Sequence, residues 1–81
     1  MKAIVRKVNY KRGLIVFESE SYDCGWLEIL DTVDLEEDDE LVGNFNELGG
    51  TTIIKKSTGE KIEVFIEDYG MSYKKAVEII Y

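Results

Sequence analysis

The chain has 81 residues, of which 44% are hydrophobic and 33% charged, and its formal net charge is −7. A chain of this length forms one domain with a thin core, since folding buries only somewhat more than ~60% of its unfolded surface. It has no histidine and one cysteine, Cys24, which excludes the common Cys/His zinc sites and any intramolecular disulfide. We therefore expect one domain over residues 1–81, in a reducing, cytoplasmic setting.

The first half of the chain contains three predicted strands. The segment 2–8, KAIVRKV, mixes β-branched residues with charges at nearly alternating positions, and the NYKRG turn follows, with Gly13 suited to a positive φ. The segment 14–19, LIVFES, is apolar on both faces, as expected of a strand covered on both sides. After the turn ESYD, the segment 24–30, CGWLEIL, is the third strand. These elements predict a β-meander.

The second half begins with an acidic connection at 31–39 and continues with three more predicted strands. ELVGNF at 40–45 is the fourth strand, and its internal Gly43 is typical of a bulge or barrel corner. TTIIKK at 51–56 and KIEVFIED at 61–68 flank STGE, which is a hairpin signal. The absence of proline leaves the strand ladders uninterrupted.

A short helix is predicted at about 72–81. Gly70 ends the strand pattern, and Ser72 is a residue type that caps helices. One apolar face then recurs at helical spacing, made by Tyr73, Ala76, Val77 and Ile80. A helix this short is marginal alone, so we expect its apolar face to dock on the strands.

Short strands, tight turns and a terminal helix predict a mostly β fold, a small antiparallel barrel of five to six strands with a short C-terminal helix. The strand order, Gly13 and the stretch Asp39-Glu40-Leu41-Val42-Gly43 resemble OB-fold-type barrels, in which a D-x-V-x-G corner is common. The resemblance implies an oligonucleotide-binding face on strands two and three. The connection at 31–39 replaces the usual helix of that family. An SH3-like barrel is the alternative.

The acidic connection is the most unusual segment. Residues 31–40, DTVDLEEDDE, hold seven carboxylates and no cation. The segment lacks the glycine and the spacing of an EF-hand loop, although Asp31 and Asp34 could hold a cation between them. A solvated connection that keeps the domain dispersed is the simpler interpretation. The candidate partner-binding residues are Asp34, Glu36, Glu37, Asp38, Asp39 and Glu40.

Residues 1–12 carry five cations and no acid, whereas residues 13–50 carry twelve acids and no base. The basic segment suggests single-stranded nucleic-acid binding, with aromatic side chains stacking on bases. Its candidate residues are Arg6, Lys7, Lys11, Arg12, Tyr10 and Trp26, with Tyr22 nearby. The competing interpretations are cation pairing with Glu18, Glu20 and Glu28 on neighbouring strands, and a core position for Trp26.

Catalysis is not expected. The sequence has no histidine for acid–base chemistry and no glycine-rich phosphate loop or nucleophile motif. Cys24 lies between Asp23 and Gly25, which favours a buried small hydrophobe over a thiolate. Tyr69, Tyr73 and Tyr81 either form an aromatic surface for a protein partner or seal the barrel. We expect no cofactor and no bound metal.

The sequence therefore predicts a non-catalytic binding module whose acidic surface recognises a protein with a basic surface. Nucleic-acid binding is the alternative, disfavoured by the net charge of −7. A monomer or a weak homodimer is expected, with TTIIKK as a possible edge strand. No signal peptide or membrane segment is expected, because the apolar runs are only a few residues long and a spanning helix needs ~20.

Overall fold

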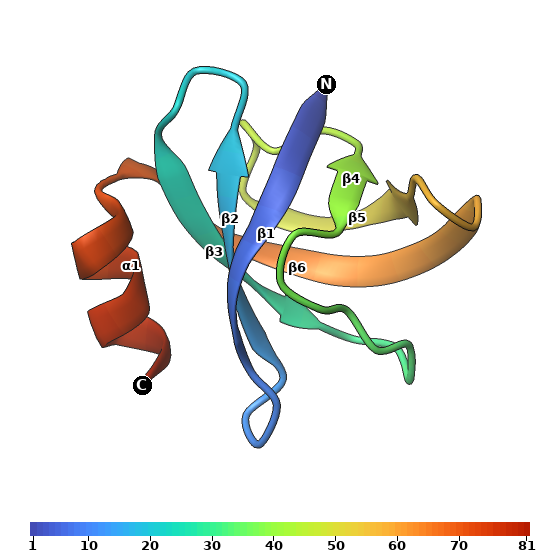
Figure 1. Ribbon diagram of the computed structural model, residues 1–81, viewed down its shortest axis with the longest axis horizontal. Helices are drawn as coiled ribbons and strands as arrows, with labels where there is room; N and C mark the ends of the chain where they lie inside the picture. The colour runs from blue at the N-terminus through green and yellow to red at the C-terminus, as the bar shows by residue number, and fades with distance from the viewer.

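Six strands and one short helix make up the computed structural model, which describes residues 1–81 (Figure 1). The strands are β1 (Lys2–Asn9), β2 (Leu14–Ser19), β3 (Cys24–Ile29), β4 (Glu40–Val42), β5 (Gly49–Lys55) and β6 (Glu60–Met71). The helix α1 (Tyr73–Ile80) follows β6. No helix is both long and apolar enough to cross a membrane.

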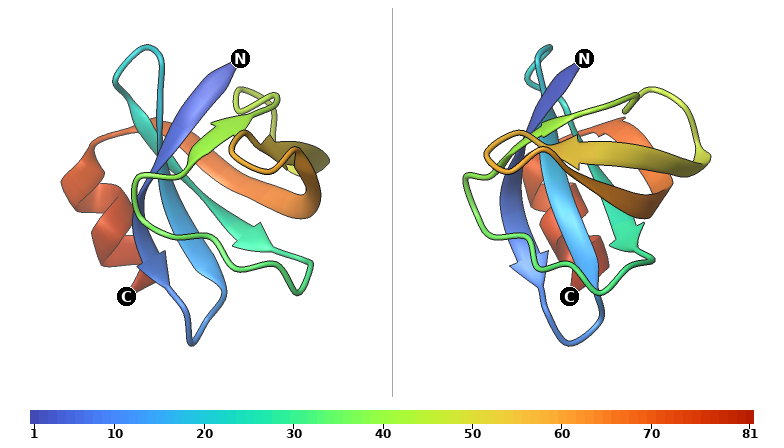
Figure 2. Two further views of the ribbon diagram at one scale, coloured as in Figure 1. Left: turned by 45° about the vertical axis from the view of Figure 1, so that its right-hand side comes forward. Right: turned by 90° about the vertical axis from the view of Figure 1, so that its right-hand side faces the viewer.

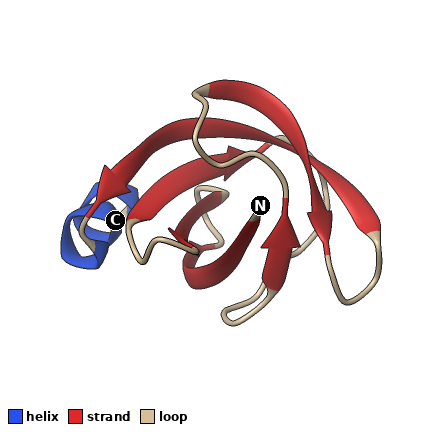
Figure 3. Cartoon of the chain, turned by 90° about the horizontal axis from the view of Figure 1, so that it is seen from above, coloured by secondary structure: helices blue, strands red, loops and turns tan.

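The strands close into an antiparallel barrel in the order β1-β2-β3-β6-β5-β4, with β4 returning to pair with β1. This confirms the predicted fold class, a mostly β barrel with a short C-terminal helix. The closed ladder has six strands, one more than the five of an OB-fold. Seen from above, α1 lies outside the strands at one side (Figure 3).

Alternation of apolar and polar side chains explains why these segments form strands. In β1, Ala3 and Val5 are buried, whereas Ile4 and Arg6 are exposed. A bulge between Val5 and Lys7 shifts this pattern by one residue. β6 shows the same period of two, with Ile62, Val64 and Ile66 fully buried. The burial of these inward side chains supplies the main stabilisation of a small barrel.

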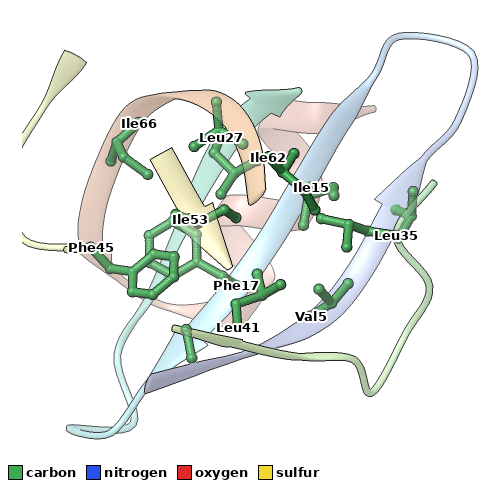
Figure 4. Close-up of a cluster of buried hydrophobic side chains, with 13 residues drawn as sticks. Val5, Ile15, Phe17, Leu27, Leu35, Leu41, Phe45, Ile53, Ile62 and Ile66 are labelled. Carbon is green, nitrogen blue, oxygen red and sulfur yellow. The ribbon is translucent and has the colours of Figure 1, made fainter. Parts of the chain in front are cut away.

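Thirteen buried residues form the barrel core, and two of them come from connections instead of strands (Figure 4). Leu35, in the connection between β3 and β4, is 1% exposed. Phe45, in the connection between β4 and β5, is 0% exposed, and its ring centroid lies 5.0 Å from that of Phe17. The two side chains lie at opposite sides of the cluster in the close-up (Figure 4). Each connection therefore closes part of the barrel with one large apolar residue.

A second, smaller hydrophobic cluster lies outside the barrel, beneath α1. This outer cluster consists of Leu14, Val16, Cys24, Ala76 and Ile80, with Trp26, Met71 and Val77 packed against it. It explains why β2 is apolar on both faces, since Ile15 and Phe17 belong to the core. The helix packs on β2 and β3, and it lies beside these strands in Figure 1 and in the left view of Figure 2.

Two hydrogen bonds hold α1, one at each end of the helix. At its start, the Ser72 hydroxyl accepts a hydrogen bond from the Lys75 N–H at 3.2 Å, which is the predicted N-cap. At its end, the Asn9 side-chain amide donates to the Ile80 carbonyl at 2.6 Å. Because Asn9 is buried, this bond also satisfies a polar group beneath the helix.

Two predicted strand ends differ from the structure by three residues, and several other boundaries differ by one or two. The fourth strand was expected over 40–45 but ends at Val42, because the chain turns at Gly43 to carry Phe45 into the core. A Cβ atom at Gly43 would lie 2.8 Å from Ile53 Cγ2, so the close approach requires glycine. The last strand does not end before Gly70 but runs to Met71, since Gly70 adopts a φ of 73° and the ladder to β3 continues.

Candidate functional site

The acidic connection is anchored to the barrel, although most of its side chains are exposed. Leu35 is inserted into the barrel core, and Val33 packs against that core. The Asp38 N–H donates to the Val5 carbonyl at 2.8 Å, and the Val5 N–H donates to the Asp39 carbonyl at 2.9 Å. These bonds extend the pairing of β4 with β1, so the connection has a fixed position beside the first strand.

A tight turn gives this connection its local shape. The Glu36 N–H donates to Asp39 Oδ2 at 2.8 Å, and the Asp39 N–H donates to the Glu36 carbonyl at 3.1 Å. Asp38 has a φ of 75°, in the left-handed region that aspartate tolerates better than most residues. The backbone of the turn is therefore held by its own hydrogen bonds as well as by β1.

The structure divides the six predicted partner-binding acids into two groups. Asp39 and Glu40 form ion pairs within the chain, with Lys55 at 3.6 Å and with Lys56 at 3.1 Å. The other four acids are exposed, and no cationic group lies within 4.0 Å of their carboxylates. We call this second group the acidic turn; it consists of Asp34, Glu36, Glu37 and Asp38. Of the six predicted acids, those of the acidic turn are the ones that form no ion pair within the chain.

The basic segment, residues 1–12, forms β1 and the turn after it, and is used in part within the chain. Arg6 forms an ion pair with Glu18 at 3.0 Å, and its guanidinium lies 5.8 Å from the ring centroid of Tyr73. Arg12 donates to the Ile80 carbonyl at 3.2 Å, at the end of α1. Lys7 and Lys11 form no ion pair. Of the four predicted basic residues, two therefore have structural partners.

The aromatic residues predicted for base stacking do not come together. Tyr10 and Tyr22 are 65% and 85% exposed, but Tyr10 lies in the turn before β2 and Tyr22 in the turn after it. These two turns are at opposite ends of the strand (Figure 1). Trp26 is half-buried against the outer cluster, with α1 over the same face of the meander. The expected oligonucleotide-binding face is therefore covered in part by the helix.

The helix brings two other tyrosines, Tyr73 and Tyr81, to β1. Their place beside this strand was not predicted from the sequence. Tyr73 lies beside Arg6, and the Tyr81 hydroxyl donates to the Val8 carbonyl at 2.8 Å. Both rings remain partly exposed. Tyr73 and Tyr81 are eight residues apart, a spacing that places both on one side of a helix, but the sequence does not show which strand that side faces.

The surroundings of Cys24 do not activate its thiol. Cys24 is buried in the outer cluster, and burial, together with the negative charge of Glu18, raises the pKa of its thiol. A raised pKa lowers the thiolate fraction near neutral pH and so opposes nucleophilic reactivity. No group of three or more Cys, Asp and Glu side chains converges in the way that a metal site requires.

Comparisons with protein-family models, with curated proteins and with solved structures find no match to this chain.

Proposed function

We propose that this chain is a non-catalytic, cytoplasmic binding module that recognises a basic protein surface through the acidic turn. The observation that carries this proposal is that the four carboxylates have no internal partner while their backbone is held by Leu35 and by bonds to Val5. A fixed array of charges loses little conformational entropy on binding. Electrostatic complementarity then accelerates encounter and selects partners of opposite charge.

The proposal is tested by an amide NMR titration with an acetylated, amidated peptide that alternates glycine and arginine. We expect shifts at residues 34–38 at low salt, and weaker binding at physiological ionic strength, where the Debye length is ~8 Å. Neutralising the acidic turn by Asp34→Asn, Glu36→Gln, Glu37→Gln and Asp38→Asn is expected to weaken binding about tenfold. This follows because exposed ion pairs contribute ~0.2–1 kcal/mol each and ~1.4 kcal/mol is a factor of ten.

A matched variant controls for net charge. It neutralises four acids outside the acidic turn that form no ion pair, at Glu28, Glu60, Glu67 and Glu78. This variant has the same total charge as the neutralised turn, so it is expected to keep most of the affinity. Equal losses from the two variants would show that only net charge matters, and the proposed role of the acidic turn would be rejected.

Single-stranded nucleic-acid binding is the second candidate, and one observation favours it. The helix places Tyr73 beside Arg6 on the outer face of the meander, and aromatic rings next to cations are the usual means of binding single strands. Against it, acids flank β1 on both sides, since Ile4 pairs with Glu18 on β2 and with Glu40 on β4. These charges would repel phosphates.

A mixed-sequence single-stranded oligonucleotide, titrated at low salt, tests this candidate. Shifts at residues 6–11 and at Tyr73, lost on Lys7→Glu with Lys11→Glu, would support it. Arg12 is left unchanged because its guanidinium binds the Ile80 carbonyl, so its replacement would disturb α1 as well as the surface. A spectrum without shifts would exclude this candidate under these conditions.

A further inference from the structure

The largest hollow on the molecule, of about 330 Å³, lies over the beginning of β1 and is separate from the acidic turn. Its wall and floor include Lys2, Ile4, Glu18, Glu20, Tyr22 and Glu40. Ile4 is the apolar centre and is 38% exposed. The strand register places Glu18 on one side of Ile4 and Glu40 on the other. Directly paired residues have Cβ atoms ~5 Å apart, so two carboxylates flank an exposed apolar side chain.

Tyr22 provides the aromatic part of the hollow. It is 85% exposed, which is the highest exposure of any large hydrophobic residue in the chain. Its backbone has a φ of 67° and is held by a hydrogen bond from its N–H to the Ser19 carbonyl at 3.0 Å. The turn is closed further by the Ser19 N–H, which donates to the Asp23 carbonyl at 2.9 Å. The ring is therefore carried by an ordered turn.

The charges of the hollow are mostly negative. Glu18, Glu20 and Glu40 line it, and Lys2 is its only cation. Glu18 and Glu40 each pair with a cation that is not among the lining residues, Arg6 and Lys56. Glu20 accepts a hydrogen bond from the Lys2 backbone N–H at 2.9 Å, with no side-chain cation as its partner. An occupant that complements this surface has an apolar stem and a cationic end.

We propose that this hollow binds an arginine side chain of the basic partner, an inference that rests on the proposed function. The aliphatic stem packs on Ile4, and the guanidinium lies between Glu20 and Glu40 against the ring of Tyr22. Arginine fits better than lysine because its planar, weakly hydrated cation stacks on aromatic rings and donates to two carboxylate groups at once. Glu40 lines the hollow and directly follows Asp39 in the chain, so the hollow adjoins the segment that carries the acidic turn.

The test uses two peptides of equal length that alternate glycine with either arginine or lysine. The arginine peptide is expected to bind more tightly and to shift the amides of Ile4, Glu20 and Tyr22. Tyr22→Ala is expected to weaken arginine-peptide binding about two- to fivefold, the range of an exposed cation–π contact. Tyr22→Phe is expected to retain the affinity. Equal affinities for the two peptides would overturn the assignment of arginine.

Three further variants keep this test independent of folding. Tyr22→Gly removes the ring but suits the positive φ, so it is expected to fold well and still lose affinity. Lys2→Met removes the competing cation and is expected to strengthen binding about twofold. Tyr10→Ala removes another exposed ring, at the other end of β2, and is expected to leave binding unchanged. If Tyr10→Ala weakened peptide binding as much as Tyr22→Ala, the hollow would be rejected as the binding site.

The outcomes separate this inference from the proposed function. If neutralising the acidic turn weakens binding but Tyr22→Gly does not, the hollow is rejected and the proposed function stands. If Tyr22→Gly weakens binding but the neutralised turn does not, the hollow stands and the acidic turn is not the binding surface. If the wild-type chain binds neither peptide at low salt, both proposals are rejected.

Discussion

The two connections that flank β4 do the same structural work with different residues. Residues 31–39 and residues 43–48 each insert one large apolar side chain into the barrel core, Leu35 and Phe45. In the second connection, the Asn44 side chain accepts a hydrogen bond from the Asn46 N–H at 3.2 Å and donates one to Glu47 Oε2 at 3.1 Å. This connection carries one acid, Glu47, whereas the first exposes Asp31 and the four acids of the acidic turn. Inserting a large apolar side chain into the core therefore does not require a run of exposed carboxylates.

The comparison separates two kinds of residue in a connection: those that anchor it to the barrel, and those that it exposes to solvent. Leu35, and the side chain of Asp39, hold the first connection in place. The side chains of the acidic turn form no ion pair and no hydrogen bond within the chain that would hold the connection. Substitutions at anchoring positions should therefore lower stability, and substitutions at displayed positions should change binding alone.

The largest effect on stability is expected at Phe45. Phe45→Ala removes a fully buried ring that packs on Phe17, and we expect it to lower the free energy of unfolding by ~3–5 kcal/mol. Denaturant unfolding at low temperature measures this loss. Leu48→Ala is the control in the same connection; its side chain is 60% exposed, and a change within ~0.5 kcal/mol is expected. Similar losses from the two variants would contradict the anchoring role of Phe45.

Leu35→Ala is expected to lower the free energy of unfolding by ~2–4 kcal/mol, somewhat less than Phe45→Ala because the deleted side chain is smaller. It should also broaden the amide resonances of residues 34–38, since the connection loses its apolar anchor. Stability is measured by denaturant unfolding and local order by NMR. A stable variant in which residues 34–38 remain as ordered as before would show that the bonds to Val5 suffice.

The sequence was informative wherever local pattern determines structure. Residues 14–19 and 61–68 show their burial directly in their apolar spacing, and Ser72 marks the start of the helix. Leu35 and Phe45 could not be recognised as core residues, because each has polar residues on both sides in the sequence and its burial depends on closure of the barrel. The hollow over β1 was equally hidden, since Tyr22 and Glu40 come together only through the pairing of β1 with both β2 and β4.

The smallest effect provides the sharpest comparison, because it contrasts two aspartates of one connection. Asp39→Ala removes the acceptor of the Glu36 N–H and the partner of Lys55, so we expect a loss of ~1–2 kcal/mol in the free energy of unfolding. Asp34→Ala should change stability by less than ~0.5 kcal/mol, because Asp34 is exposed and forms no ion pair.

The affinity for the arginine peptide is expected to rank Asp39→Ala and Asp34→Ala in the opposite order to their loss of stability. Each variant removes one negative charge, so a purely electrostatic effect would weaken binding equally. Asp34→Ala removes a charge that is free to pair with the peptide, whereas Asp39→Ala removes one that Lys55 already neutralises in part. We therefore expect the greater loss of affinity from the variant with the smaller loss of stability. If Asp39→Ala lost more affinity as well as more stability than Asp34→Ala, then the residues that anchor this connection could not be distinguished from those that bind the partner.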